Sequence, residues 1–249
     1  MTYRIHCSYH KCLTVYFMRV LSGLYNRVFF LSRGYRHFTS RIEQFYFDLN
    51  DFKVASVNNH PLDFDRLGPD FLISRFIRDP RDLVVSGYFY HRRGAEAWTR
   101  IVDPAPEDLT IVNGSIPENM GQGHSFASYL EDLSQDEGLM AEIEFRKRHF
   151  DSMRQWPLDD PRIKLFRYED IIGREAAVFR DLLAHYRVSA LEQRLGSLLA
   201  VHFSAKKQRR MLKHIRNPAA GQWKKHFTPR VEAFFNQHYA DILKRYGYE

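Results

Sequence analysis

Hydrophobic residues along the chain follow two patterns: short, mostly apolar runs, and stretches in which apolar residues recur every three to four positions. The short runs, typical of buried strands, lie at residues 3–7, 52–57, 71–77 and 162–168. The recurring pattern, typical of helices, covers residues 13–24, 80–91, 125–133, 137–156, 175–186, 191–203 and 229–245. Strands that alternate with helices predict an α/β fold on a central, mostly parallel, doubly wound sheet.

Two segments show no sustained period. Residues 26–50 are aromatic and basic, and residues 94–123 contain three prolines and four glycines. A loop as long as 94–123 inside a compact domain is usually a lid, a binding loop or a disordered segment, and we expect a lid or mobile loop on the substrate side. At 249 residues the chain fits one large α/β domain, so we expect a single domain over residues 1–249. The sequence contains no internal repeats or low-complexity segments.

Composition and charge narrow the possible ligands. The net charge of the 249 residues is +7 and the pI is about 9.4, which favours a nucleotide, a nucleic acid or a sulfated sugar. Cys7 and Cys12 are too few for a disulfide framework, and the sequence has no run of 18 apolar residues for a membrane span. The basic N-terminus also lacks the apolar stretch of a secretory signal, so we expect a cytoplasmic protein.

The first sixteen residues read as a strand, a tight basic loop and the start of a helix. Lys11 lies in the loop and Thr14 at the helix start. Such a helix end favours an anion, because N–H groups outside the helix ladder and the helix dipole point toward it. On this stretch alone, an ordinary strand-to-helix turn with one exposed lysine is an equal alternative. The loop is not a Walker A motif, because the glycines of that motif are absent.

Four segments, in order, resemble the nucleotide-binding elements of the sulfotransferases that use PAPS (3′-phosphoadenosine 5′-phosphosulfate). Residues 10–16, HKCLTVY, are similar to the 5′-phosphosulfate loop P-K-S-G-T-T-W, and residues 78–86, RDPRDLVVS, match the 3′-phosphate element R-[DN]-P-x-D-x-x-x-S. Residues 165–170, LFRYED, resemble the strand end L-x-Y-E-D, and residues 216–228, RNPAAGQWKKHFT, resemble R-K-G-x-x-G-x-W-K-x-x-F-T. The resemblance implies a P-loop-like fold. It also implies transfer of a sulfuryl group from PAPS to a hydroxyl or amine of a small-molecule, lipid or carbohydrate acceptor, with PAP as product.

The resemblance assigns the 5′ end of the nucleotide to the first loop. Lys11 would hold the bridging oxygen of the leaving phosphate and Thr14 a phosphate oxygen. The rest of this cofactor-binding loop is Cys12, Leu13 and Val15. A fixed ammonium at this position acts where negative charge grows as the phosphate leaves.

The resemblance assigns the 3′-phosphate to Arg78 and Ser86, and Arg216 would close the same phosphate from the far end of the chain. Arg78 and Ser86 are eight residues apart, so both can meet one phosphate if the chain turns at Pro80 into a helix. The alternatives are a surface ion pair between Arg78 and Asp82, and a helix-face hydroxyl for Ser86. Asn217 and Pro218 belong to the same element as Arg216.

Three aromatic residues correspond to adenine-side positions of the family. Tyr16 stands where the family has a stacking tryptophan, and Tyr168 and Phe203 match other positions around the adenine. Each of the three also fits the apolar core, which is the commoner place for an aromatic residue on an apolar face.

The acceptor needs a base, and His60 is the leading candidate. It follows a predicted strand in Asn58-Asn59-His60, where the family has K-x-H, and an imidazole takes a proton readily at neutral pH. The alternatives are a histidine that only ends the strand before Pro61, and a carboxylate of the lid such as Glu118 as the base. The sequence shows no carboxylate set for Mg²⁺, so the layout requires no metal.

The segments also depart from the family pattern. Leu13 replaces a glycine, Val15 replaces a threonine and removes a hydroxyl, and Asn58 replaces a lysine. Pro218 replaces a glycine whose N–H meets the 3′-phosphate. The dimer element K-x-x-x-T-V-x-x-x-E is broken by Pro229 and Ala233, so the oligomeric state stays open.

We weighed three other functions against the sequence: nucleic-acid binding, a kinase-like nucleotide enzyme and a zinc site. Residues 206–213 form a basic run, as in proteins that follow a nucleic-acid backbone, but aromatic residues are not interleaved in it, which favours a solvated face or an anion funnel. A kinase-like nucleotide enzyme lacks support without the Walker glycines. A zinc site from His6, Cys7, His10 and Cys12 fits none of the usual ligand spacings. The sequence does not identify the acceptor.

Overall fold

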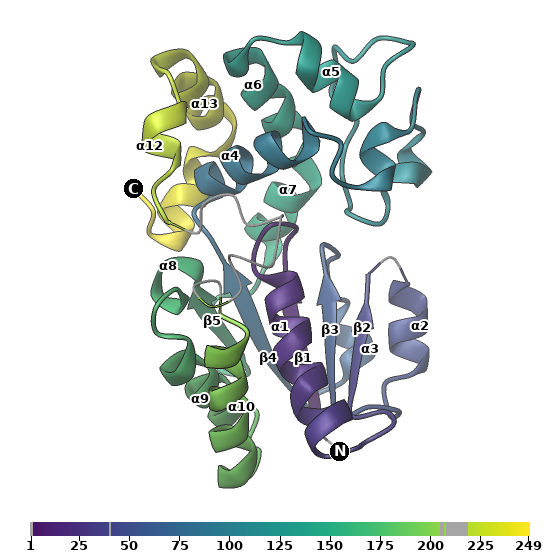
Figure 1. Cartoon of the computed structure of the whole chain (residues 1–249), viewed down its shortest axis with the longest axis vertical. Helices are drawn as coiled ribbons and strands as arrows, with labels where there is room; N and C mark the ends of the chain where they lie inside the picture. The colour runs from purple at the N-terminus through teal and green to yellow at the C-terminus, as the bar shows by residue number, and fades with distance from the viewer. Residues whose placement is uncertain (1, 40, 205–206, 208–218) are drawn as a thin grey trace. The chain divides into compact units, whose positions relative to one another are not determined.

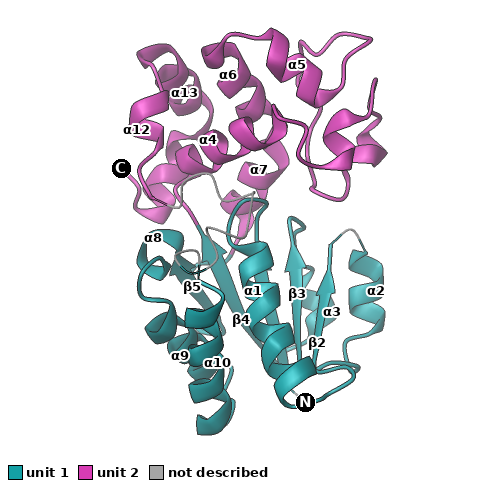
Figure 2. Ribbon diagram, viewed as in Figure 1, with its two compact units in different colours: residues 1–77, 157–218 teal, residues 78–156, 219–249 magenta. Residues whose placement is uncertain are grey.

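The structure is a computed structural model that describes residues 2–39, 41–204, 207 and 219–249. Contacts divide the chain into two compact units (Figure 2). Unit 1 comprises residues 1–77 and 157–218, and unit 2 comprises residues 78–156 and 219–249. The single-domain assignment of residues 1–249 stays a prediction. Among the described residues, no helix is both long and apolar enough to cross a membrane.

Unit 1 is built on a parallel sheet, which in the described part of the chain has five strands in the order β2-β3-β1-β4-β5 (Figure 1). The strands are β1 (Tyr3–Ser8), β2 (Tyr35–Phe38), β3 (Val54–Asn58), β4 (Phe71–Ile77) and β5 (Ile163–Arg167). Every neighbouring pair runs parallel. The strand order changes direction around β1, and ligands of α/β proteins bind beyond the carboxyl ends of strands at such a point.

The four predicted strands are confirmed, but β2 was not predicted. It lies inside the segment 26–50, and its sequence YRHF contains no apolar run. It pairs with β3 alone among the described strands, so it is an edge strand. An edge strand needs fewer apolar residues than a central one, which explains why hydrophobic pattern did not reveal it.

Helices pack against this sheet in unit 1. They are α1 (Thr14–Leu21), which continues as the π-helix η1 (Ser22–Val28), and α2 (Ile42–Phe47), α3 (Phe64–Leu67), α8 (Tyr168–Ile171), α9 (Glu175–His185) and α10 (Ala190–His202). The ring of Phe17 on α1 stacks on His6 of β1, with centroids 3.5 Å apart. Phe179 of α9 lies 6.1 Å from Phe17 and 6.2 Å from Phe76 of β4. Helices α1 and α9 therefore cover the same face of the sheet.

Unit 2 is helical among its described residues. Its elements are α4 (Pro80–His91), the 3-10 turns η2 (Ala97–Arg100) and η3 (Pro106–Leu109), α5 (Phe126–Asp132), α6 (Gln135–Phe145), α7 (Lys147–Gln155), α12 (Trp223–His226) and α13 (Pro229–Tyr246). An aromatic core holds η2, α5 and α6 together, with Phe145 at 5.3 Å from Trp98 and 4.8 Å from Phe126. Thr228 caps α13 and Pro229 opens it, as the sequence predicts.

The single helix predicted over residues 137–156 is wrong, because two helices meet there at Arg146. The backbone of Arg146 leaves helical geometry, with ψ at 5°. Its side chain turns back to Glu142, whose Oε1 accepts from Arg146 Nε at 2.8 Å, while Oε2 lies 2.7 Å from His91 Nδ1. All three side chains are fully buried. The buried polar cluster anchors the end of α6 at Arg146, and α7 begins at the next residue.

Candidate active site

The loop between β1 and α1 turns twice through the left-handed region of backbone conformation. Lys11 has φ of 71° and Leu13 has φ of 59°. Residues with a Cβ rarely adopt this region, and a bulky residue there costs about 1 kcal/mol. Leu13 occupies the position at which the sulfotransferase pattern has glycine, so the structure gives a conformational reason for the glycine of the pattern.

The helix that follows presents its N-terminus at the end of this loop. It begins at Thr14 directly after Leu13, and its first turn contains no acidic residue. N–H groups in the first turn of a helix have no carbonyl partner within the helix, so they favour an anion there. Lys11, three residues before this helix, is half-buried. Lys11 is therefore not the fully exposed lysine of an ordinary turn, and anion binding at this helix start stays a prediction.

The end of β3 is tied to this loop by two asparagines. Asn59 donates its backbone N–H to Ser8 O at 2.9 Å and accepts from His10 N at 2.5 Å through Oδ1. Asn58, only 1% exposed, accepts the hydroxyl proton of Ser8, and Ser8 Oγ lies 3.0 Å from Thr14 Oγ1. From the sequence, Asn58 belongs to the polar strand end before His60 and replaces a lysine of the family pattern, but its contact with Ser8 is not predicted. Two amides at the end of a buried strand were the available signal.

His60 is the residue after this clamp and is half-buried. Strands β1 and β3 are parallel with Ser8 opposite Asn58, so the loop of Lys11 and the strand end before His60 open at the same edge of the sheet. The role of His60 as a base stays a prediction.

The start of the loop is also held from β4. Arg75 is 1% exposed and donates through Nη2 to the hydroxyl of Tyr9, whose ring centroid lies 4.9 Å from the guanidinium carbon. Tyr9 precedes the basic loop and is itself buried. Groups from β3 and β4 therefore fix the loop on both sides of β1.

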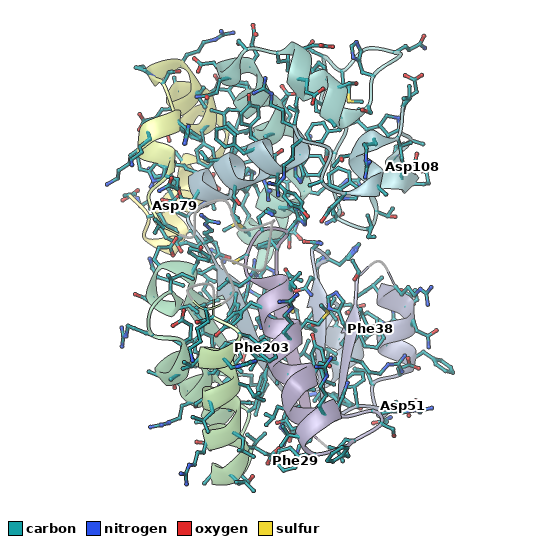
Figure 3. All side chains as sticks on the ribbon, viewed as in Figure 1. Phe29, Phe38, Asp51, Asp79, Asp108 and Phe203 are labelled. Atoms are coloured by element: carbon teal, nitrogen blue, oxygen red, sulfur yellow. The ribbon has the colours of Figure 1, made fainter. Side chains whose placement is uncertain are left out.

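The predicted adenine-side aromatics have different surroundings within unit 1. Tyr16 donates its hydroxyl to Ala200 O at 2.8 Å and packs its ring 5.4 Å from Phe179. Burial raises the pKa of Tyr16, which keeps its phenol protonated. Phe203 follows α10, where Figure 3 labels it, and its ring lies against Gly23 of η1. Tyr168 is buried at the start of α8. Adenine binding by these residues stays a prediction.

In unit 2, Arg78 precedes α4 and Ser86 lies on that helix, as the sequence predicts. Asp79 caps α4 by accepting from Arg81 N at 2.9 Å, and Pro80 is the first helical residue (Figure 3 labels Asp79). Arg78 is 4% exposed, and its Nη2 lies 3.8 Å from Asp82 Oδ2. The ion pair considered from the sequence is therefore present but buried, at a separation beyond hydrogen-bonding distance.

Asp82 joins the second and fourth family-like segments. It is fully buried, and its carboxylate accepts from Gly221 N at 2.7 Å and from Trp223 N at 2.9 Å. The guanidinium of Arg81 stacks over the Trp223 ring at 3.6 Å. Sequence reasoning considered Asp82 only as a partner of Arg78. The predicted residues Arg216, Asn217 and Pro218, and most of the basic run 206–213, lie outside the described residues.

The lid predicted over residues 94–123 has local order. It contains η2 and η3, and Val102 forms an antiparallel bridge with Ser125 at its far end. Glu118, the alternative base, is exposed, and its N–H donates to Glu144 Oε2 at 3.1 Å. A lid function and a catalytic role for Glu118 stay predictions.

Comparison with protein families gives a match to the sulfotransferase domain over residues 75–247, which is more than half of the chain. The matched range includes Arg78, Ser86 and the segment 216–228, but it starts after the loop of Lys11. A comparison with curated proteins gave no match.

Two solved structures are similar over almost the whole chain. Mouse sulfotransferase SULT7A1 complexed with PAP matches with a TM-score of 0.52 and 15% identity, covering 97% of this chain and 84% of the mouse protein. Retinol dehydratase in complex with androsterone and the inactive cofactor PAP matches with a TM-score of 0.51 and 16% identity, covering 96% and 80%. At this identity the likeness shows a shared fold, which confirms the predicted α/β architecture.

Proposed function

Because the chain belongs to the sulfotransferase domain family, we propose that it transfers the sulfuryl group of PAPS to a hydroxyl or amine acceptor. The observation that carries the proposal is the clamp of Asn58 and Asn59, which joins the loop of Lys11 to the strand end of His60. Leaving group and acceptor must lie on opposite sides of the sulfur for in-line displacement. The clamp joins the loop assigned to the leaving group to the strand end assigned to the acceptor, as such a displacement requires.

The 5′ end of PAPS is assigned to Lys11, Thr14 and the first-turn N–H groups of α1. As the acceptor oxygen bonds to sulfur, the bond between sulfur and the bridging phosphate oxygen breaks, and PAP leaves with the electron pair. The ammonium of Lys11 stabilises the charge that grows on that oxygen. The acceptor proton passes to His60. Positioning and charge stabilisation are most of the catalytic work in such transfers.

The 3′-phosphate is assigned to Arg78 and Ser86. A guanidinium presents a planar fork of donors that matches two phosphate oxygens, and the helix start at Pro80 adds a favourable dipole. The assignment of Arg216, Asn217 and Pro218 to the same phosphate rests on the resemblance alone. No metal is assigned a role in the reaction.

Sulfuryl transfer from radiolabelled PAPS to a panel of sugars, phenols, sterols and amines tests this function. We expect labelled product with at least one acceptor class. A His60→Asn variant should lose at least about 100-fold in turnover, because a general base contributes that much, while its PAP affinity and melting temperature stay near the wild-type values. Normal turnover of His60→Asn would remove histidine from the mechanism and point to a carboxylate such as Glu118.

A further inference from the structure

A buried carboxylate lies directly beside the residue assigned to the 3′-phosphate. Asp82 is fully buried one helical turn after Arg78, within the same unit. An anion at this place should repel a phosphate, so its presence needs an explanation. The contacts of its two oxygens provide one.

Both carboxylate oxygens of Asp82 hold the backbone of the segment 219–223. Oδ2 accepts from Gly221 N at 2.7 Å, and Oδ1 accepts from Trp223 N at 2.9 Å. Hydrogen bonds to an ionised group are about twice as strong as those between neutral groups, and more so when buried. The segment begins directly after residue 218, so Asp82 fixes the described part of the fourth family-like element on α4.

The same carboxylate supplies the counter-charge of a buried arginine. The Arg78 guanidinium is 3.8 Å from Asp82, and a charge buried to this degree needs a partner. Because the Asp82 oxygens are bonded to two backbone N–H groups, the carboxylate balances Arg78 at a distance beyond hydrogen bonding. The two N–H groups and Arg78 therefore compensate most of the negative charge of Asp82 before a phosphate binds.

We propose that Asp82 is a positioning residue for 3′-phosphate specificity: it holds the segment 219–223 on α4 and keeps Arg78 in place for the phosphate. This inference rests on the proposed function. The substrate feature that Asp82 selects is the 3′-phosphate itself, which distinguishes PAPS and PAP from nucleotides that carry only a 5′ group. Asp82 does not touch the reacting atoms.

The test is a calorimetric titration of the full chain with PAP and with adenosine 5′-phosphate, which lacks the 3′-phosphate. The ratio of the two affinities isolates the contribution of that phosphate. Asp82→Asn keeps the shape but places an amide donor against a backbone N–H. We expect it to lower the preference for PAP about tenfold or more, with the affinity for adenosine 5′-phosphate within about twofold of wild type.

Two further variants distinguish an effect of positioning from an effect of charge and from a general loss of stability. Gly221→Ala leaves every charge in place and strains only the backbone, because Gly221 has φ of 74° and nothing lies within 4 Å of an added Cβ. It should lower the preference for PAP in the same direction, by a smaller factor, and it tests the inference even if Asp82→Asn folds poorly. Glu142→Gln changes another fully buried carboxylate of unit 2, paired with His91 and Arg146. It should lower the melting temperature and leave the preference unchanged.

The outcomes separate this inference from the proposed function. If wild type prefers PAP and Asp82→Asn keeps or increases that preference, charge repulsion outweighs positioning and the inference is wrong, while the proposed function stands. An equal loss in Asp82→Asn and Glu142→Gln would also overturn it, since both would then act through stability. A wild-type protein without any preference for PAP would overturn the proposed function and the inference together.

Discussion

Two residues without the conformational freedom of glycine, Lys11 and Leu13, adopt left-handed backbone angles in the loop after β1. Such conformations persist only when surrounding contacts hold them, and here Asn58, Asn59 and Arg75 supply those contacts. These contacts hold Ser8, Tyr9 and His10, so the loop that contains Lys11 starts from a fixed position at the carboxyl ends of β1 and β3. In-line displacement requires fixed positions of the reacting groups.

For Lys11, we expect turnover to depend on the side chain far more than nucleotide binding does. Lys11→Ala should lower turnover about 100- to 1000-fold, because the ammonium acts on charge that develops in the transition state, and should weaken PAP binding less than about tenfold. Rates with radiolabelled PAPS and titration with PAP measure the two effects. Lys164, whose ammonium pairs with Asp181 at the surface, provides the control, and Lys164→Ala should change neither value. Equal losses in rate and binding for Lys11→Ala would contradict the leaving-group role.

At the scale of elements, α4 packs closely against α6 at Gly87, where the lack of a side chain leaves room for Glu142 and Arg146. A Cβ at this position would lie 2.0 Å from Glu142 Oε1 and 2.4 Å from Arg146 Nη2, both in a buried cluster. Gly87→Ala should lower the free energy of unfolding by about 1–3 kcal/mol, measured by urea denaturation. Gly121→Ala, where nothing lies within 4 Å, should change it by less than about 0.5 kcal/mol. Similar effects in the two variants would show that α4 and α6 adjust without cost.

His6, on the sheet face that α1 covers, should make the stability of the protein depend on pH. Burial lowers the pKa of His6 well below its usual value of 6.5, and the nearby His37 lowers it further. The folded protein therefore keeps His6 neutral, while the unfolded chain takes up a proton below pH 6.5. The free energy of unfolding should fall as pH drops from 7 toward 5, by up to about 1.4 kcal/mol per pH unit for this residue, and stay level above pH 7.

Urea denaturation of wild type and His6→Phe at several pH values measures this effect. The phenyl ring preserves the stacking on Phe17, and Ser74 keeps its hydrogen bond to Tyr186 at 2.6 Å. We expect a shallower pH dependence in the variant. The remaining slope reflects other groups, because the pKa values of His37 and His185 are also lowered by burial. An unchanged slope would mean that His6 is not the titrating residue.

The sequence predicted the elements whose signals are local. The strands of unit 1 other than β2, the cap of α13, and the placement of Arg78 before a helix that carries Ser86 follow from apolar runs and helix-start residues. The contacts of Asn58 with Ser8 and of Asp82 with Gly221 join residues 50 and 139 positions apart. No local pattern encodes such pairs. The break at Arg146 depends likewise on burial of Glu142 and His91.

At the scale of the whole molecule, the family match and the hydrogen-bonded loop after β1 support assignments in different parts of the chain. The family match begins at residue 75, whereas the loop of Lys11 and the clamp of Asn58 and Asn59 precede it. The assignment of the 5′ end therefore rests on the geometry of unit 1, and that of the 3′ end on the motif and contacts of unit 2. The net charge of +7 agrees with a ligand that carries several negative charges.

The most direct test of the central claim, that this chain binds a 3′-phosphorylated adenine nucleotide as a sulfotransferase does, is the titration of wild type and Arg78→Ala with PAP and adenosine 5′-phosphate. We expect wild type to bind PAP at least about 100-fold more tightly, since a phosphate held by charge-assisted hydrogen bonds contributes about 3 kcal/mol. Arg78→Ala should lose most of this preference while keeping its affinity for adenosine 5′-phosphate. Equal binding of the two nucleotides by wild type, or an undiminished preference in Arg78→Ala, would contradict the account.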